Sequence, residues 1–77
     1  MTQAYILINC DAGKAALVVK KMRRLAGVKN AKVVTGLHDI VALVESGSLA
    51  TLAKTVVSKV QTIRGVGRTV TMVCVDV

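Results

Sequence analysis

The two halves of the chain follow the same pattern of hydrophobicity. Each half runs from an aliphatic strand-like segment, through a segment with the 3.6-residue period of an amphipathic helix, to a second strand-like segment. The strand-like segments cover residues 4–10, 29–35, 39–45 and 68–77, and the helix-like segments cover residues 14–26 and 49–63. Both helix-like segments are followed by a Gly-Val pair, at Gly27-Val28 and Gly65-Val66. The order of elements is therefore βαββαβ.

This order predicts an α+β fold of the ferredoxin-like type, an α/β sandwich. Right-handed crossovers put the first and third strands in the centre of a four-stranded antiparallel sheet, the fourth and second strands at its edges, and both helices on one face. A chain of 77 residues has the size of one small domain, so we expect a single domain over residues 1–77.

Local signals mark the ends of the expected helices. Asp11 stands where a side chain can cap the first helix, and Ser48 stands where one can cap the second. Gly27 and Gly65 follow the last helical turns, at a position that favours a left-handed backbone.

Side-chain alternation in the strands predicts self-association. Alternate residues of a strand point to opposite sides of a sheet. In the first strand, one set is Ala4, Ile6, Ile8 and Cys10, and the opposite set is Tyr5, Leu7 and Asn9. In the third strand, Ile40, Ala42 and Val44 oppose Val41 and Leu43, and in the fourth, Val70, Met72 and Cys74 oppose Thr71, Val73 and Val75. Both sets are largely apolar, whereas a sheet with one solvated side carries polar residues there. Because two helices can cover only one side, we expect a homodimer in which the uncovered sides pack face to face.

The composition argues against a metal centre, a cofactor site and an enzyme. With two cysteines and one histidine, one subunit cannot supply a metal site of ordinary ligand count. Cys10 should lie opposite residues 68–70, and Cys74 should lie opposite the start of the first strand, so we expect two buried free thiols too far apart to bridge. Cys10 and His38 can be considered as a nucleophile and base, but nothing in the sequence supplies an orienting third group. We expect no catalytic residues, no metal and no cofactor.

No segment is suited to membrane insertion or export. No apolar stretch is long enough to cross a bilayer, and the N-terminus has neither a basic region nor a small-residue cleavage site. We therefore expect a cytoplasmic protein without a membrane partner.

The formal net charge of +7 favours contact with nucleic acid or an acidic partner. The basic residues on the helices include Lys14, Lys20, Lys21, Arg23, Arg24, Lys54 and Lys59. They form either a solvated helix surface or a phosphate-binding patch. Tyr5 is the single aromatic residue, which argues against a sheet that stacks bases on aromatic side chains. An adaptor that binds nucleic acid or an acidic partner through the first helix is one functional hypothesis.

The segment Thr35–Ser46, TGLHDIVALVES, contains a tight turn directly before an apolar strand. Gly36, His38 and Asp39 either reverse the chain and nothing more, or present backbone N–H groups and a carboxylate to a ligand. Read alone, each residue is ordinary for a turn.

Together with features elsewhere in the chain, this segment resembles the ligand-sensing domain of the Lrp/AsnC family of regulators of amino-acid metabolism. That domain carries a V-x-G-x-x-D turn between its second and third strands, which appears here from Val34 to Asp39. Other matching features are a Gly-Lys helix start at Gly13-Lys14, the Gly-Val pairs after both helices, and a Thr-x-Thr fourth strand at Thr69 and Thr71. The chain resembles a stand-alone form of the domain, without a preceding helix-turn-helix domain.

The resemblance implies a non-enzymatic regulatory module. Dimers of such domains assemble into an octamer or similar ring, and an amino acid or related effector binds at the contacts between dimers. The residues implied in ligand binding are Thr35, Gly36, Leu37, His38, Asp39, Thr69 and Thr71. The partners implied are copies of the chain, an amino-acid effector and full-length Lrp/AsnC regulators.

Three features depart from the family pattern, and one alternative within the same fold stays open. Sequence-specific DNA reading does not carry over without a helix-turn-helix domain, so we do not expect direct DNA binding. His38 stands where the family often has an aromatic residue, and the high positive charge is not a family requirement. An ACT-like allosteric module, with side-by-side sheets, shares the fold and the ligand class.

Overall fold

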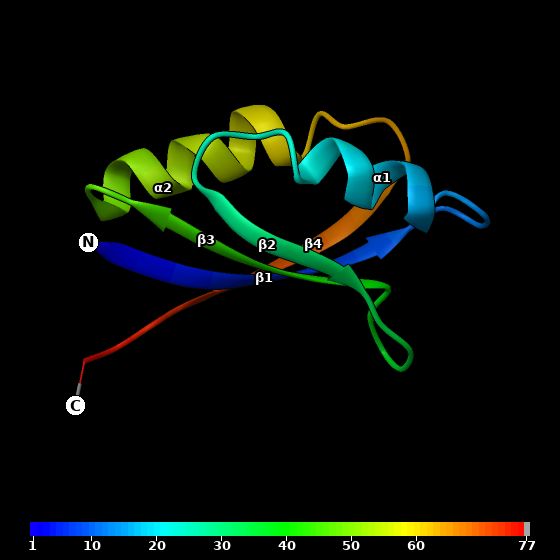
Figure 1. Ribbon diagram of the computed structural model, residues 1–77, viewed down its shortest axis with the longest axis horizontal. Coiled ribbons are helices and arrows are strands. Elements are labelled where there is room, and N and C mark those ends of the chain that lie inside the picture. The colour runs from blue at the N-terminus through cyan, green and yellow to red at the C-terminus, as the bar shows by residue number, and fades with distance from the viewer. Residues whose placement is uncertain (77) are drawn as a thin grey trace.

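The computed structural model describes residues 1–76, except for the side chain of Val57. Its elements in chain order are β1 (Thr2–Cys10), α1 (Ala15–Met22), β2 (Val28–Val33), β3 (Ile40–Ser46), α2 (Leu49–Thr55), η1 (Val56–Val60) and β4 (Val66–Val73). η1 continues α2 directly, so the predicted βαββαβ order is confirmed (Figure 1).

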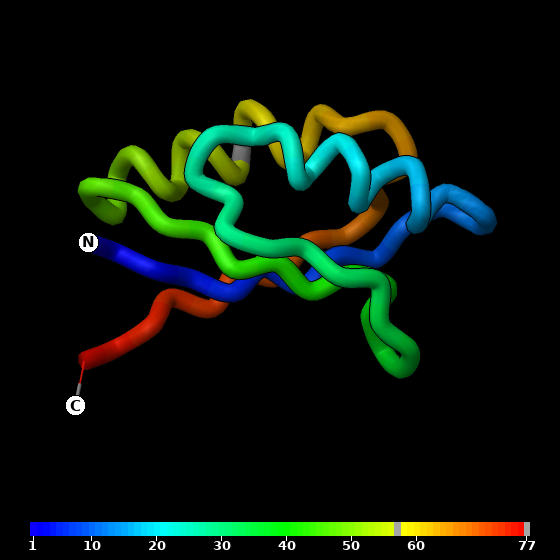
Figure 2. Tube along the Cα trace, in the orientation of Figure 1, coloured from blue at the N-terminus to red at the C-terminus, as the bar shows by residue number. Residues whose placement is uncertain are grey.

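One four-stranded sheet has the order β2-β3-β1-β4, with every neighbouring pair antiparallel. This is the predicted ferredoxin-like topology, with β1 and β3 central. Both helices lie on one side of the sheet, and the opposite side carries no helix (Figures 1 and 2).

The hydrophobic core lies between the sheet and the two helices. Its fully or almost fully buried side chains are Ala4, Ile6, Ile8, Ala31, Ile40, Ala42 and Val44 from the sheet, and Val18, Val19, Met22, Leu52, Val56 and Val60 from the helices. The alternation separated the two sides of β1 and β3, and the structure shows that the helices cover the side with Ala4, Ile6, Ile8, Ile40, Ala42 and Val44.

The first helix is shorter than predicted and is capped differently. α1 ends at Met22 rather than at residue 26, because Arg24 and Leu25 donate backbone hydrogen bonds to residues three positions back instead of four. Lys14 is the N-terminal cap residue and no side chain caps this end. The predicted side-chain cap by Asp11 is wrong; the Asp11 carbonyl oxygen instead accepts a hydrogen bond from the Lys14 N–H at 3.0 Å.

The second helix begins as predicted and changes its hydrogen-bond spacing near its end. The Ser48 hydroxyl accepts a hydrogen bond from the Thr51 N–H at 3.1 Å, which confirms the predicted cap. From Val56 to Val60 the helix widens to π geometry, and the Gln61 N–H donates to the Val56 carbonyl five residues back. Leu52, Val56 and Val60 remain on the core side throughout.

The last strand lies earlier in the chain than predicted. β4 begins at Val66 and ends at Val73; Val77 lies outside the described residues. Cys10 consequently pairs with Val66 rather than with residues 68–70. Both thiols are free, but only Cys10 is partly buried and Cys74 is exposed, so the predicted burial of Cys74 is wrong.

Two further findings concern the described part of the chain. None of its helices is long and apolar enough to cross a membrane. No three of its His, Cys, Asp and Glu side chains are grouped as metal ligands.

A substitution at Gly27 tests how tightly the chain after α1 packs on β3. Gly27 has φ +90°, and an added Cβ would lie 2.9 Å from the Glu45 carbonyl oxygen. Gly27→Ala should therefore lower the free energy of unfolding by about 2 kcal/mol or more, measured by urea denaturation. Gly47→Ala is the control, because a Cβ there meets nothing within 4 Å. Equal effects of the two substitutions would contradict this account of the packing.

Candidate functional site

The turn between β2 and β3 projects from one end of the sheet, toward the side without helices (Figure 1). Gly36 has φ +127°, and a Cβ added there would meet nothing within 4 Å. Thr35 and Gly36 are exposed, and the Leu37 side chain is 91% exposed. The turn therefore presents backbone and one large apolar side chain to its surroundings.

Asn9 fixes the orientation of this turn. Its side-chain N–H donates to the Leu37 carbonyl at 2.8 Å, and its oxygen lies 2.9 Å from Nδ1 of His38. Because the amide oxygen can only accept, the His38 Nδ1 carries the proton that joins them. The Nε2 atom of His38 is then the ring nitrogen that remains for another partner.

Asp39 connects the turn to the central strand. Its Oδ2 accepts a hydrogen bond from the Cys10 N–H at 2.7 Å, and its own N–H donates to the Ile8 carbonyl at 2.9 Å. Its carbonyl accepts from the Val34 N–H at 2.9 Å, closing the turn. One carboxylate oxygen of Asp39 thus has a structural partner within the chain.

Two shallow hollows flank the turn. One, of about 390 Å³, is lined by Asn9, Leu37, His38, Arg68 and Val70. The other, of about 370 Å³, is lined by Asp39, Val33, Cys10 and the residues that lead into α1. Neither Asn9 nor Arg68 was predicted from the sequence. Asn9 carries a detectable signal, since it is a polar residue at the end of the aliphatic run Ile6–Ile8.

The two threonines of β4 lie on the other side of the sheet. Thr69 pairs with Ile8 and Thr71 with Ile6, so both share the helix-covered side with buried residues. The Thr69 hydroxyl accepts a hydrogen bond from the Gln61 side chain at 3.0 Å. Thr71 lines a hollow of about 270 Å³ between α2 and β4. Within one chain, the fold brings the turn residues together, but it does not place Thr69 and Thr71 beside them.

The environment of Cys10 does not favour its thiol as a nucleophile. Partial burial, followed by the charges of Asp39 and Asp11, raises the pKa of its thiol. The thiol is therefore protonated at neutral pH, when it is a poor nucleophile. The Nδ1 atom of His38 is hydrogen-bonded to Asn9, as described above.

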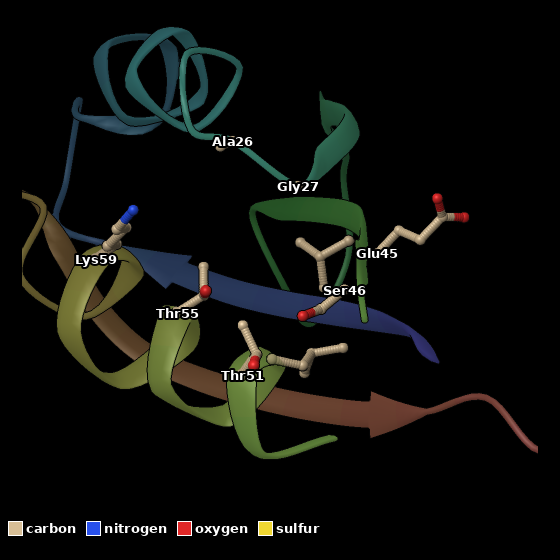
Figure 3. Close-up of a pocket in the computed structure, with 9 residues that line it drawn as sticks. Ala26, Gly27, Glu45, Ser46, Thr51, Thr55 and Lys59 are labelled. Atoms are coloured by element: carbon tan, nitrogen blue, oxygen red, sulfur yellow. The ribbon is translucent and has the colours of Figure 1, made fainter. Parts of the chain in front are cut away.

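Another hollow, of about 290 Å³, lies away from the turn, between the second helix and residues 26–27 (Figure 3). The polar side chains that line it are Glu45, Ser46, Thr51, Thr55 and Lys59. No motif in the sequence pointed to it, because its residues come from three separate segments.

Comparison with known proteins identifies the family. The family model for the Lrp/AsnC ligand binding domain matches residues 3–77. The chain belongs to the Lrp/AsnC family. A curated Lrp/AsnC relative, an uncharacterized HTH-type transcriptional regulator of Pyrococcus horikoshii, is 35% identical over 75 residues, which are 94% of this chain and 50% of the relative. The suspected resemblance is confirmed, and it favours this family over an ACT-like module.

Solved structures have the same fold. A protein of Thermus thermophilus superimposes with a TM-score of 0.94 at 27% identity, covering all of this chain and 96% of that one. A transcriptional regulator of Neisseria meningitidis, solved as a complex with L-Met, has a TM-score of 0.86 at 17% identity and shares the fold over 97% of this chain and 50% of its own. The chain spans about half the length of the curated relatives it matches.

The hydrogen bond between Asp39 and Cys10 can be tested without a ligand. Asp39→Ala leaves the Cys10 N–H without its acceptor and should lower the free energy of unfolding by about 1–3 kcal/mol. Asp39→Asn retains an acceptor oxygen and should cost less. The control is Asp76→Ala, since Asp76 is exposed near the C-terminus. Hydrogen exchange should show faster exchange of the Cys10 amide in Asp39→Ala; unchanged protection would contradict the assigned bond.

Proposed function

We propose that this Lrp/AsnC domain is a non-enzymatic regulatory module that binds an amino acid or a related small effector between subunits. Binding is coupled to oligomer assembly and, through it, to transcription regulation. The observation that carries the proposal is the turn from Val34 to Asp39, which combines exposed backbone, a carboxylate and an imidazole at an open edge.

The turn has chemistry suited to both charged ends of an amino acid. Within the described part of the chain, no hydrogen bond uses the backbone N–H of Gly36 or Leu37. These groups suit a carboxylate, since successive backbone N–H groups form anion-binding sites. Asp39 keeps Oδ1 for an ammonium group, because its structural bond uses Oδ2.

A second subunit would complete such a site. The hollows beside the turn are open, and Leu37 is almost wholly exposed. Enclosed sites bury most of a small ligand, so a neighbouring subunit is needed to close over it. Thr69 and Thr71 of a neighbouring copy remain candidates for that contribution. The L-Met complex of the Neisseria regulator shows that one protein with this fold takes an amino acid.

Assembly begins at the side of the sheet without helices. Leu7 is opposite Val41 and Val70, and Tyr5 is opposite Leu43 and Met72, which makes a continuous apolar surface. Tyr5 on β1 and the edge-strand residues Val70 and Met72 are 39–47% exposed. We propose that these surfaces pair in a homodimer and that dimers form an octamer or similar ring. Mixed assembly with full-length relatives would then transmit the effector-binding signal. A ligand that prefers the assembled form stabilises it.

Calorimetric titration against the common amino acids tests the ligand class. Asp39→Asn keeps an oxygen for the Cys10 N–H but removes the charge, so it should weaken effector binding about tenfold or more. Asp76→Asn makes the same chemical change at an exposed, remote position and should have no effect. Equal affinity of wild type and Asp39→Asn would remove Asp39 from the site. Failure of the assembled protein to bind any amino acid would overturn the proposed ligand class.

Sedimentation analysis tests the pairing surface. Leu7→Lys places a charge in the middle of the apolar surface and should convert dimers or larger assemblies to monomers at micromolar concentration. Leu17→Lys is the matched control, because Leu17 is 49% exposed on α1, on the helix side. A wild-type protein that sediments as a monomer, or an unchanged assembly of Leu7→Lys, would contradict pairing through this side.

A further inference from the structure

The positive charge of the chain is concentrated on one layer. Residues 12–38 and 46–75 contain no Asp or Glu, and these two segments contain all 11 Lys and Arg residues. Eight of the 11 lie on or beside the helices: Lys14, Lys20, Lys21, Arg23, Arg24, Lys54, Lys59 and Arg64. We call this set the basic helix layer. All of its members are exposed.

The acidic residues do not neutralise this layer. Glu45 accepts a hydrogen bond from Gln3 at 2.8 Å and pairs with Lys29 of β2 at 3.5 Å; that is the one salt bridge among the described residues. The hydrogen bond from Gln3, and after it the charge of Lys29, lower the pKa of Glu45. One oxygen of Asp39 accepts from the Cys10 N–H. Arg23 donates through Nε to the Ala31 carbonyl oxygen at 3.0 Å, and among the described residues no member of the basic helix layer forms a salt bridge.

The hollow beside the second helix adds hydrogen-bond donors to this layer. Thr51, Thr55 and Lys59 are spaced four residues apart, which places them in one row along the helix. Figure 3 shows the three side chains pointing to the same side, toward Ala26 and Gly27. The Glu45 carboxylate points away from this hollow. Two hydroxyls followed by an ammonium group suit a phosphate, which proteins bind with Lys, Arg, Ser and Thr side chains.

We propose that the basic helix layer binds the phosphate backbone of nucleic acid without reading its sequence. A row of cations on helices that contain no Asp or Glu matches a polymer with one negative charge per phosphate. With a single aromatic residue, Tyr5 on β1, the helix layer has no side chain on which bases stack. Binding should therefore depend on charge and be similar for many sequences.

This proposal is independent of the effector site and compatible with it. The basic helix layer and the surface proposed for pairing lie on opposite sides of the sheet (Figures 1 and 2). A face-to-face dimer would leave both helix layers on its outside. Such an assembly would present two binding surfaces, which would strengthen binding to long nucleic acid.

Fluorescence anisotropy with a labelled 20-base-pair DNA duplex and a 20-nucleotide RNA tests the proposal. With four or more phosphate contacts, raising NaCl from 50 to 200 mM should weaken binding about 100-fold or more. Changing the sequence of the DNA should leave the affinity within about threefold, in contrast to the discrimination that base contacts give. Undetectable binding at 50 mM NaCl, or an affinity that does not depend on salt, would overturn the proposal.

Charge-matched variants locate the surface. Lys59→Glu removes one phosphate contact and should weaken binding about eightfold at 0.1 M salt. The double variant Lys21→Glu with Lys59→Glu should weaken it about 50-fold or more. Lys32→Glu is the control, because Lys32 makes the same charge change but pairs with Val41, on the side without helices. Equal losses in Lys59→Glu and Lys32→Glu would show a response to net charge alone and overturn the assigned surface.

Two further measurements separate this proposal from its alternatives. Polyglutamate at equal charge should compete at least tenfold less effectively than nucleic acid; equal competition would indicate an acidic-protein surface instead. Sedimentation and amino-acid titration of the double variant should match wild type. Loss of amino-acid binding with intact nucleic-acid binding in Asp39→Asn would support two separate sites.

Discussion

The sheet of this domain is aliphatic on both sides, and its own helices cover only one of them. The covered side contributes Ile6, Ile8 and Ile40 to the core, all fully buried. Burying one such side chain stabilises a protein by about 1.5–3 kcal/mol, and a chain of this size has little stability in reserve. The uncovered side offers a second set of apolar side chains, among them Leu7, Val41 and Leu43, which the proposed pairing would bury.

β1 connects this surface to the turn. Three consecutive residues near its end have different functions: Ile8 enters the core, Asn9 holds Leu37 and His38, and the Cys10 N–H binds Asp39. Leu7, just before them, belongs to the uncovered apolar side. A change in how two sheets pack would therefore reach the turn through adjacent residues of one strand, which would give the proposed effector binding and the proposed assembly a short physical connection.

The fold was predictable because it is determined by the spacing of the hydrophobic residues and by the order of the helices and strands along the chain. The 3.6-residue period and the strand-like segments predicted the elements, and right-handed crossovers predicted the strand order. The alternation separated the two sides of each strand but did not show which side the helices cover. Element ends were less predictable because they depend on single hydrogen bonds. Asp11 has an acid's usual preference for a helix start, yet Lys14 is the N-cap residue of α1. The widening of the helix at Val56–Val60 does not change the 3.6-residue period of the hydrophobic residues in a detectable way.

The candidate site was predictable in its position along the chain but not in its geometry. Gly36 and Asp39 marked the turn correctly, since positive φ and a carboxylate at a strand start both have local causes. The partner of Asp39 is 29 residues away, at Cys10, and only the folded register brings them together. The register also decides that Thr69 and Thr71 lie on the helix side of β4, which the Thr-x-Thr pattern alone does not reveal.

The placement of charge is consistent with both proposed surfaces. On the side of the sheet without helices, the two central strands present Tyr5, Leu7, Val41 and Leu43 as neighbours; Glu45, on the same side near the end of β3, lies opposite Gln3 and pairs with Lys29. Lys32 is on an edge strand of this side, where its ammonium group can stay in water when sheets pair. Desolvating a charge at an interface costs several kcal/mol, and copies with a net charge of +7 repel one another. A chain that confines most of its positive charge to the helix layer can therefore associate through its sheet at close range while keeping a strong positive field on its outside.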